Sequence, residues 1–162
     1  MQAFITLYSK ELKRFLRIWT QTLLPPIINQ TLYLTIFGSI IGSKIGEIAG
    51  VSYIQFILPG LLMMSVVMGT YSNVVSSFFG SKFQRSVEEL LVAPVSNFTI
   101  LQGYCLGGIS RGIIAGVLVL LTSLVFSSFQ IHSIALVLIY TFLSSYVFAQ
   151  AGFLNGLFAK KF

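Results

Sequence analysis

The chain has 162 residues, of which 56% are hydrophobic and only 9% charged. A water-soluble domain usually has about a quarter charged residues, so this composition excludes a soluble protein and predicts a polytopic membrane protein. Ten basic residues outnumber four acidic ones. The basic residues gather beside apolar stretches, where lipid headgroups and membrane topology account for them, so no nucleic acid is expected as a partner.

Residues 1–19 are predicted to form an amphipathic helix that lies along the membrane surface. One helical stripe is apolar and the opposite face is basic. The apolar stripe consists of Phe4, Ile5, Tyr8, Leu12, Phe15, Leu16 and Trp19, and the basic face consists of Lys10, Lys13, Arg14 and Arg17. A cleaved signal peptide is disfavoured, because the apolar stretch that follows is too long and shows no small-residue cleavage site.

Residues 20–162 are predicted to form an all-α transmembrane bundle with four spans, at about 21–43, 53–79, 97–126 and 133–158. Pro25 and Pro26 are expected to end the first helix and to open the next one. Pro59 and Gly60 permit a kink in the second span, either as a gate or as a packing bend.

Several single residues, and three sets of regularly spaced glycines, are expected to serve packing or hydrogen bonding. Asn29 and Gln30 are expected to form hydrogen bonds between helices. Cys105 is expected to be a small buried hydrophobe and His132 a solvated loop residue. Glycines spaced by four permit close helix approach within the chain or in a dimer. These are Gly38 and Gly42, then Gly108, Gly112 and Gly116, and finally Gly152 and Gly156.

Residues 80–96 form the one strongly polar interval between long apolar segments. Ser86 and Glu89 have the spacing of a capping box, which predicts a short helix from Val87, and Pro94 ends it. Val87, Leu90 and Leu91 share an apolar face, flanked by Glu88 and Glu89. Paired carboxylates are repelled by an anionic leaflet, so we interpret this helix as a docking element for a soluble partner. The alternative is an ordinary capped turn between two spans.

The basic residues near the span ends predict the orientation. On one side of the membrane they are Lys10, Lys13, Arg14, Arg17, Lys82, Arg85, Lys160 and Lys161, and on the other side Lys44 stands alone. The positive-inside rule therefore places the N-terminus, the docking loop and the C-terminus in the cytoplasm.

The sequence lacks one residue type and several motifs, and their absence reduces the number of function classes to consider. The chain has no aspartate and its predicted spans have no carboxylate, which disfavours a secondary carrier driven by an ion gradient. No Walker A sequence, H-E-x-x-H motif or metal-spaced Cys and His cluster occurs. The chain is therefore expected to be no enzyme, to bind no metal or cofactor, and to receive its energy from another chain.

Arg111 is the single charge within a predicted span. It is expected either to reach headgroups or backbone carbonyls, or to contact an anionic, lipid-like substrate along a transport pathway.

Taken together, these residues resemble the permease subunit of type-2 ABC exporters, in particular the YadH-like inner-membrane permeases. Four segments carry the resemblance: RFLRIWTQTLLPP (Arg14 to Pro26), YIQFILPGLLMMSV (Tyr53 to Val66), SSFFGSKFQRSVEELLVAPV (Ser76 to Val95) and AGFLNGLFAKKF (Ala151 to Phe162). The resemblance covers the whole chain, although such permeases normally have six spans and this sequence has four.

The resemblance implies a permease in the bacterial inner membrane with a cytoplasmic N-terminus. Residues 1–19 would be the connecting helix, and the segment from Ser86 to Pro94 would be the coupling helix that docks on a separate ATPase subunit, which binds ATP and Mg²⁺. Two permease copies would move an amphiphilic drug, lipid or lipid-linked saccharide. The alternative is a truncated, non-transporting membrane scaffold or regulatory subunit.

Overall fold

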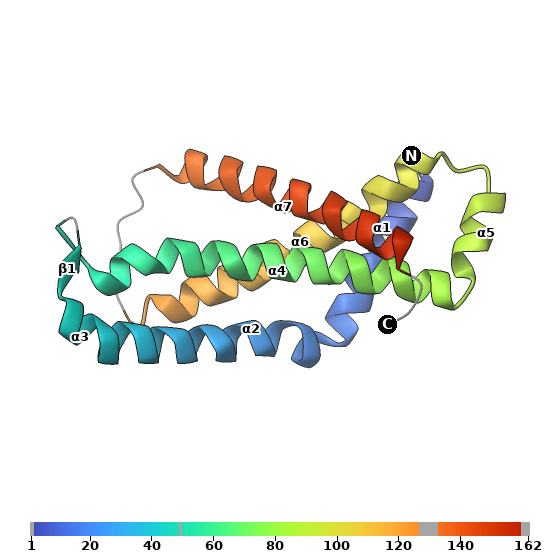
Figure 1. Cartoon of the computed structure of the whole chain (residues 1–162). Coiled ribbons are helices and arrows are strands. Elements are labelled where there is room, and N and C mark those ends of the chain that lie inside the picture. The colour runs from blue at the N-terminus through green and yellow to red at the C-terminus, as the bar shows by residue number, and fades with distance from the viewer. Residues whose placement is uncertain (1, 49, 127–132, 160–162) are drawn as a thin grey trace.

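The computed structural model describes residues 2–48, 50–126 and 133–159, and these residues form a helical bundle (Figure 1). Within the described residues, four helical stretches are long and apolar enough to cross a membrane: Trp19–Ile45, Tyr53–Phe83, Asn97–Ser123 and Ile134–Phe158. An amphipathic helix, α1 (Gln2–Arg17), precedes them. The predicted fold class is therefore confirmed. His132, Lys160 and Lys161 lie outside the described residues.

The first span begins earlier than the sequence predicts. Helix α2 (Trp19–Tyr33) follows α1 after a single non-helical residue, Ile18, with φ −112° and ψ 36°. Pro25 and Pro26 lie inside α2, so the prediction that they separate the two helices and open the second was wrong. The span continues as a π-helix, η1 (Leu34–Ile41), and ends with α3 (Gly42–Ile45).

A small hairpin caps the end of the bundle opposite α5. Strands β1 (Glu47–Ile48) and β2 (Val51–Ser52) are antiparallel, with Glu47 opposite Ser52 and Ile48 opposite Val51. Gly46 and Gly50 have φ values of 74° and 79°, a left-handed conformation that glycine adopts without steric cost. The short alternation of these residues carries too little signal to predict the strands.

Helix α4 (Tyr53–Phe83) is the centre of the bundle and packs against both α6 (Asn97–Ser123) and α7 (Ile134–Phe158). Gly108, Gly112 and Gly116 of α6 face α4. A Cβ at Gly112 would lie only 2.0 Å from the Thr70 hydroxyl and 2.6 Å from the Val66 carbonyl. These glycines therefore serve helix packing within the chain.

Helix α7 touches the bundle through one narrow face. Its buried residues are Ser145, Ala149, Gly152 and Gly156, spaced by three or four as one side of a helix requires. Its exposed large hydrophobic residues occupy the other sides and include Ile134, Leu138, Tyr140, Val147 and Leu154. An apolar outer surface of this kind suits lipid contact.

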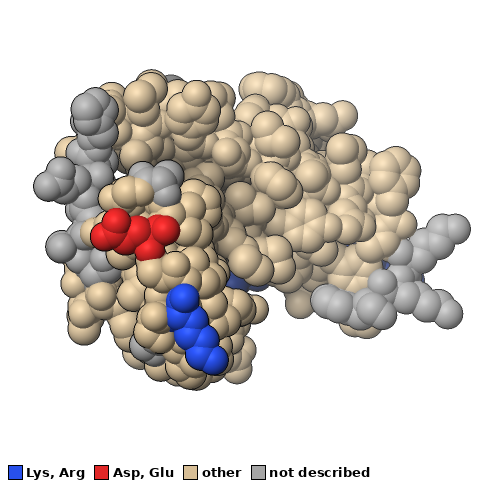
Figure 2. Space-filling view, turned by 60° about the vertical axis from the view of Figure 1, so that its left-hand side comes forward, with Lys and Arg blue, Asp and Glu red and all other residues tan. Residues whose placement is uncertain are grey.

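The two ends of the bundle consist of different elements. Figure 1 shows the start of α1, the end of α7 and α5 at one end and the hairpin at the other. Figure 2, which brings the hairpin end forward, shows a face with almost no charged side chains apart from one acidic and one basic patch.

Candidate functional site

Helix α5 (Ser86–Val92) is the predicted docking helix, but its first turn is built differently from the prediction. The residue before the helix is Arg85, with φ 58° in the left-handed region. Ser86 is the first helical residue, and its hydroxyl donates to the Ser81 carbonyl at 3.1 Å. The predicted capping box with Glu89 was therefore wrong. The chain reverses so sharply after α4 that Ser86 satisfies a carbonyl at the end of that helix.

The end of α5 follows the sequence signal. Ala93 is extended, with φ −67° and ψ 150°, and its N–H donates to the Glu89 carbonyl. The residue before a proline avoids the helical region, so Pro94 accounts for the stop at Val92.

The apolar residues of α5 are divided between two surfaces. Val87 and Leu90 are half-buried against a core cluster formed by Leu7, Phe78, Ile100 and Tyr104. Leu91 is 63% exposed and Val92 87% exposed. The single apolar face predicted for Val87, Leu90 and Leu91 was therefore wrong, because the bundle covers part of it.

The outer surface of α5 combines charge with apolar area. Glu88 and Glu89 are both exposed in its first turns, and Leu91 and Val92 are exposed in its last turn. Carboxylates in the first turn of a helix are favoured by the helix dipole. This surface can contact a protein that offers apolar and basic groups together.

Lys82, one of the basic residues that predict the orientation, has a structural role at the same end of the bundle. Its ammonium donates to the carbonyls of Leu157 and Ala159, at 2.7 and 3.1 Å. Lysine commonly satisfies the last carbonyls of a helix in this way. It therefore fastens the end of α7 to α4.

A buried polar junction joins α1 to α4 and α6. Glu11 has no exposed surface. Its Oε2 accepts a hydrogen bond of 2.6 Å from the Ser77 hydroxyl and pairs with Arg14 Nε at 3.3 Å. The Arg14 guanidinium also donates to the Asn73 side-chain oxygen at 2.8 Å and to its carbonyl at 3.3 Å. A carboxylate of α1 is thus buried in the bundle, although the predicted spans contain none.

Arg111 of α6 completes this junction. It donates to the same Asn73 oxygen at 3.4 Å and to the Thr22 carbonyl at 3.3 Å. Pro26 has no N–H, so the Thr22 carbonyl lacks the helical donor that residue 26 would otherwise supply. Arg111 therefore makes the backbone-carbonyl contact that was one of its two expected roles, at the place where α2 begins.

The junction fits closely but is incompletely paired. A Cβ at Gly107 would lie 2.5 Å from Glu11 Cβ, so glycine is what lets α1 approach α6 here. Three buried polar atoms of the junction have no hydrogen-bond partner among the described residues: Glu11 Oε1, Asn73 Nδ2 and Arg111 Nε. Leaving such atoms unpaired costs free energy.

Sequence reasoning missed Glu11, and a signal for it was present. Leu7, Glu11 and Phe15 are the buried residues of α1, and their spacing of four places them on one helical face. Gly103 and Gly107 have the same spacing in α6 and face Leu7 and Glu11. A carboxylate on the glycine-facing stripe was the available clue.

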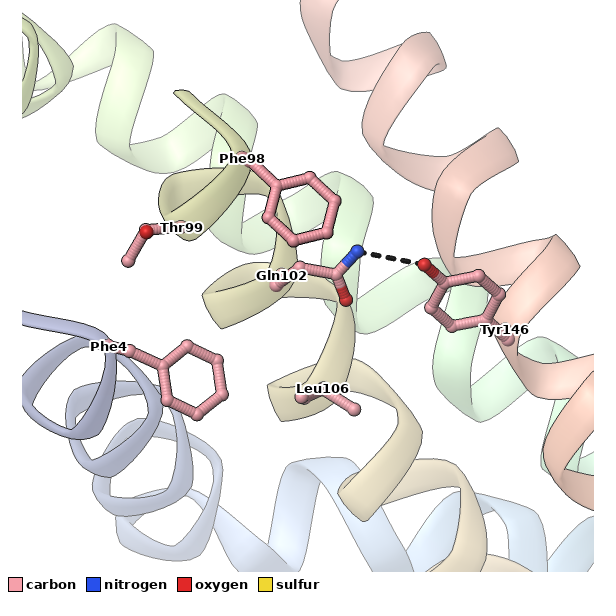
Figure 3. A pocket seen from close by; sticks show the side chains of 6 residues that line it. All are labelled: Phe4, Phe98, Thr99, Gln102, Leu106 and Tyr146. Carbon is pink, nitrogen blue, oxygen red and sulfur yellow. Dashed lines mark hydrogen bonds between the residues drawn. The ribbon is translucent and has the colours of Figure 1, made fainter. Parts of the chain in front are cut away.

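A separate pocket of about 460 Å³ opens between α1, α6 and α7 (Figure 3). Its lining residues are Phe4, Phe98, Thr99, Gln102, Leu106 and Tyr146. The Gln102 amide donates to the Tyr146 hydroxyl at 2.8 Å across it. Because these two polar groups satisfy each other, the pocket offers mainly apolar contact.

One enzyme-like pattern, which sequence reasoning overlooked, has no catalytic setting. Residues 108–112 read G-I-S-R-G and fit the G-x-S-x-G spacing of a hydrolase. They lie in the middle of helix α6 rather than at a strand-to-helix turn. The Ser110 hydroxyl is within 2.8 Å of the Tyr8 hydroxyl and donates to the Leu106 carbonyl at 2.9 Å. This serine helps to join α1 to α6.

The remaining predicted positions lie within the helices and differ in exposure. Pro59 and Gly60 lie within α4, which continues as one helix across them, and both residues are exposed. Cys105 is buried and its thiol is free. Gln30 is buried, with its side-chain nitrogen unpartnered among the described residues.

The helical fold agrees with the comparison with known families. The chain belongs to the ABC-2 type transporter family, because the sequence model of that family matches residues 2–162. It is thus a multi-pass membrane protein of this family.

Individual relatives are named inner membrane transport permease YadH. The chain is 54% identical over 160 residues to the protein of that name from Escherichia coli (strain K12), and the same identity is found with the Shigella flexneri protein. The matched region is 99% of this chain and 62% of each relative, so the chain spans less than two thirds of their length. No solved structure matches significantly.

Proposed function

We propose that this chain is part of the transmembrane permease of an ATP-driven exporter and that α5 is its docking element for a separate ATPase subunit. The observation that carries the proposal is the division of α5 into a side packed on the bundle and a side that is exposed. Val87 and Leu90 anchor the helix, while Glu88, Glu89, Leu91 and Val92 are exposed for a partner.

The contacts between the packed side of α5 and the bundle could transmit a movement of α5 to the membrane-spanning helices. Val87 and Leu90 rest on a cluster to which α1 contributes Leu7 and α6 contributes Ile100 and Tyr104. The Tyr104 hydroxyl donates to the Ser81 hydroxyl of α4 at 3.0 Å. A partner that pushes α5 would therefore act on three helices at once, because packed cores shift as units.

The partner would supply the chemistry that this chain lacks. The sequence has no Walker A motif, so ATP and Mg²⁺ would be bound by the ATPase subunit. By analogy with the named relatives, the protein would reside in the inner membrane, with α5 and the N-terminus in the cytoplasm. Two copies would form a pathway for an amphiphilic drug, lipid or lipid-linked saccharide, in keeping with the apolar walls of the spans.

Co-purification with a candidate ABC ATPase subunit, produced together with this chain, tests the proposal. The double substitution Glu88→Lys and Glu89→Lys reverses the exposed charge of α5 and should abolish co-purification or ATPase-coupled transport. Glu47→Lys is the matched control, because Glu47 is exposed in the hairpin at the other end of the bundle. Unchanged pairing and transport in the double variant would refute the docking role.

A cysteine introduced at Leu91, in a Cys105→Ala background, tests the orientation. A membrane-impermeant maleimide added outside intact cells should leave it unlabelled, and labelling should appear after the membrane is opened. Labelling in intact cells would place α5 outside the cytoplasm and end the proposal.

A further inference from the structure

The polar junction of α1, α4 and α6 contains more positive than negative charge. It has two guanidinium groups, those of Arg14 and Arg111, and one carboxylate, that of Glu11. Among the described residues, the only ion pair is the one between Arg14 and Glu11. Arg111 is held by two neutral acceptors at 3.3 and 3.4 Å, and its Nε has no partner.

The Arg111 guanidinium is partly buried among neutral acceptors, so a nearby anion would stabilise it. Removing a guanidinium from water is unfavourable unless a negative charge and good hydrogen bonds replace the water. Asn73 cannot supply the charge, and its single side-chain oxygen is already shared between Arg14 and Arg111. The junction therefore lacks about one negative charge.

The position of the junction indicates where the anion comes from. The part of α4 between Tyr53 and Asn73 is roughly 30 Å long at about 1.5 Å per residue, which equals the thickness of a typical hydrocarbon core. Tyr53 directly follows the hairpin. If the hairpin lies at one membrane boundary, Asn73 and the two guanidinium groups lie at the other, where lipid headgroups are found.

The junction is also open to the outside. The Arg14 side chain is 31% exposed, and Arg111 is half-buried. Guanidinium groups bind phosphate through parallel hydrogen bonds, and basic pockets between spans on the cytoplasmic side bind anionic headgroups.

We propose that Arg14 and Arg111 bind the phosphate group of an anionic phospholipid, which neutralises the junction and fastens α1 to the spans. The site is separate from the exposed surface of α5 and does not depend on the docking of an ATPase. The lipid is thus a structural ligand of the permease at the point where α1, α2, α4 and α6 meet.

The test uses the full chain in nanodiscs of phosphatidylcholine, with and without phosphatidylglycerol, and measures bound lipid by native mass spectrometry. Arg111→Gln should weaken phosphatidylglycerol binding about tenfold, since it removes one charge-assisted pair. Lys13→Gln is the matched control, because Lys13 is exposed on α1 next to Arg14 and its substitution removes the same charge. An equal loss in both variants would show general surface attraction and overturn the site.

Asn73→Asp gives an independent test that does not remove an arginine. The new carboxylate would accept from both guanidinium groups at nearly the same position and supply the missing charge from within the chain. Its thermal stability should be independent of phosphatidylglycerol, whereas that of the unaltered chain should rise with the lipid. A variant as lipid-responsive as the unaltered chain would refute the proposal.

Inorganic phosphate separates the two sources of a phosphate group. Added at millimolar concentration to phosphatidylcholine nanodiscs, it should leave the midpoint of thermal unfolding unchanged. A shift equal to that of phosphatidylglycerol would overturn the assignment to lipid.

Discussion

Arg111 donates a hydrogen bond of 3.3 Å to the Thr22 carbonyl, and this is the carbonyl that Pro26 deprives of its helical donor. The contact joins residues that are 89 positions apart in the sequence. It explains how a proline is accommodated inside α2, because in membrane helices other groups satisfy the carbonyls that a proline leaves free.

Pro26→Ala should weaken the dependence of the fold on Arg111. Alanine restores the N–H for Thr22, so Arg111→Gln should cost about 1 kcal/mol less free energy of unfolding in the Pro26→Ala background than in the original chain. A double-mutant cycle from unfolding in denaturing detergent measures this coupling. Pro25→Ala is the matched control, because it restores a donor to Gln21 instead. The same coupling for both prolines would contradict the assignment.

Glu11→Gln should destabilise the protein by roughly 2 kcal/mol, because the Arg14 guanidinium would lose its charged partner in a buried site. Thermal unfolding in a fixed detergent gives the difference. Glu47→Gln removes the same charge from the exposed hairpin and should change stability by less than about 0.5 kcal/mol. Equal effects of the two substitutions would show that the buried Glu11–Arg14 pair contributes no more to stability than an exposed carboxylate does.

Gly112→Ala should destabilise the bundle by about 3 kcal/mol, because its Cβ would lie 2.0 Å from Thr70 Oγ1 and 2.6 Å from the Val66 carbonyl, so α4 and α6 would have to separate. Gly60→Ala is the control within α4. A Cβ there meets nothing within 4 Å, and alanine favours a helix by up to about 1 kcal/mol. The two midpoints of thermal unfolding should therefore move in opposite directions. A tolerated Gly112→Ala would contradict the close approach of the helices.

Leu90→Ala and Leu91→Ala should have different consequences although the residues are adjacent. Leu90 packs on the core cluster, so its truncation should lower stability by about 1 to 2 kcal/mol. Leu91 is 63% exposed, so its truncation should change stability by less than about 0.5 kcal/mol and weaken co-purification with the ATPase. Equal stability losses would show that both leucines are packed.

The elements that could be predicted from the sequence were those with a local signal. The four apolar segments and the amphipathic α1 follow from composition and a helical period, and Pro94 alone accounts for the end of α5. Ser86 and Glu89 also have a recognisable local pattern, but the capping box does not form, because Arg85 turns the chain and Ser86 bonds to Ser81 of the preceding helix.

The sequence by itself determined which segments can cross a bilayer, because apolar length and charge placement are properties of each segment alone. Only the tertiary structure decided that Glu11, Arg14, Asn73 and Arg111 meet, and that Arg111 takes the carbonyl that Pro26 leaves free. Such meetings depend on how closely α1 and α4 approach α6. Glycines at 107 and 112 permit that approach, and no local pattern shows which residues they will face.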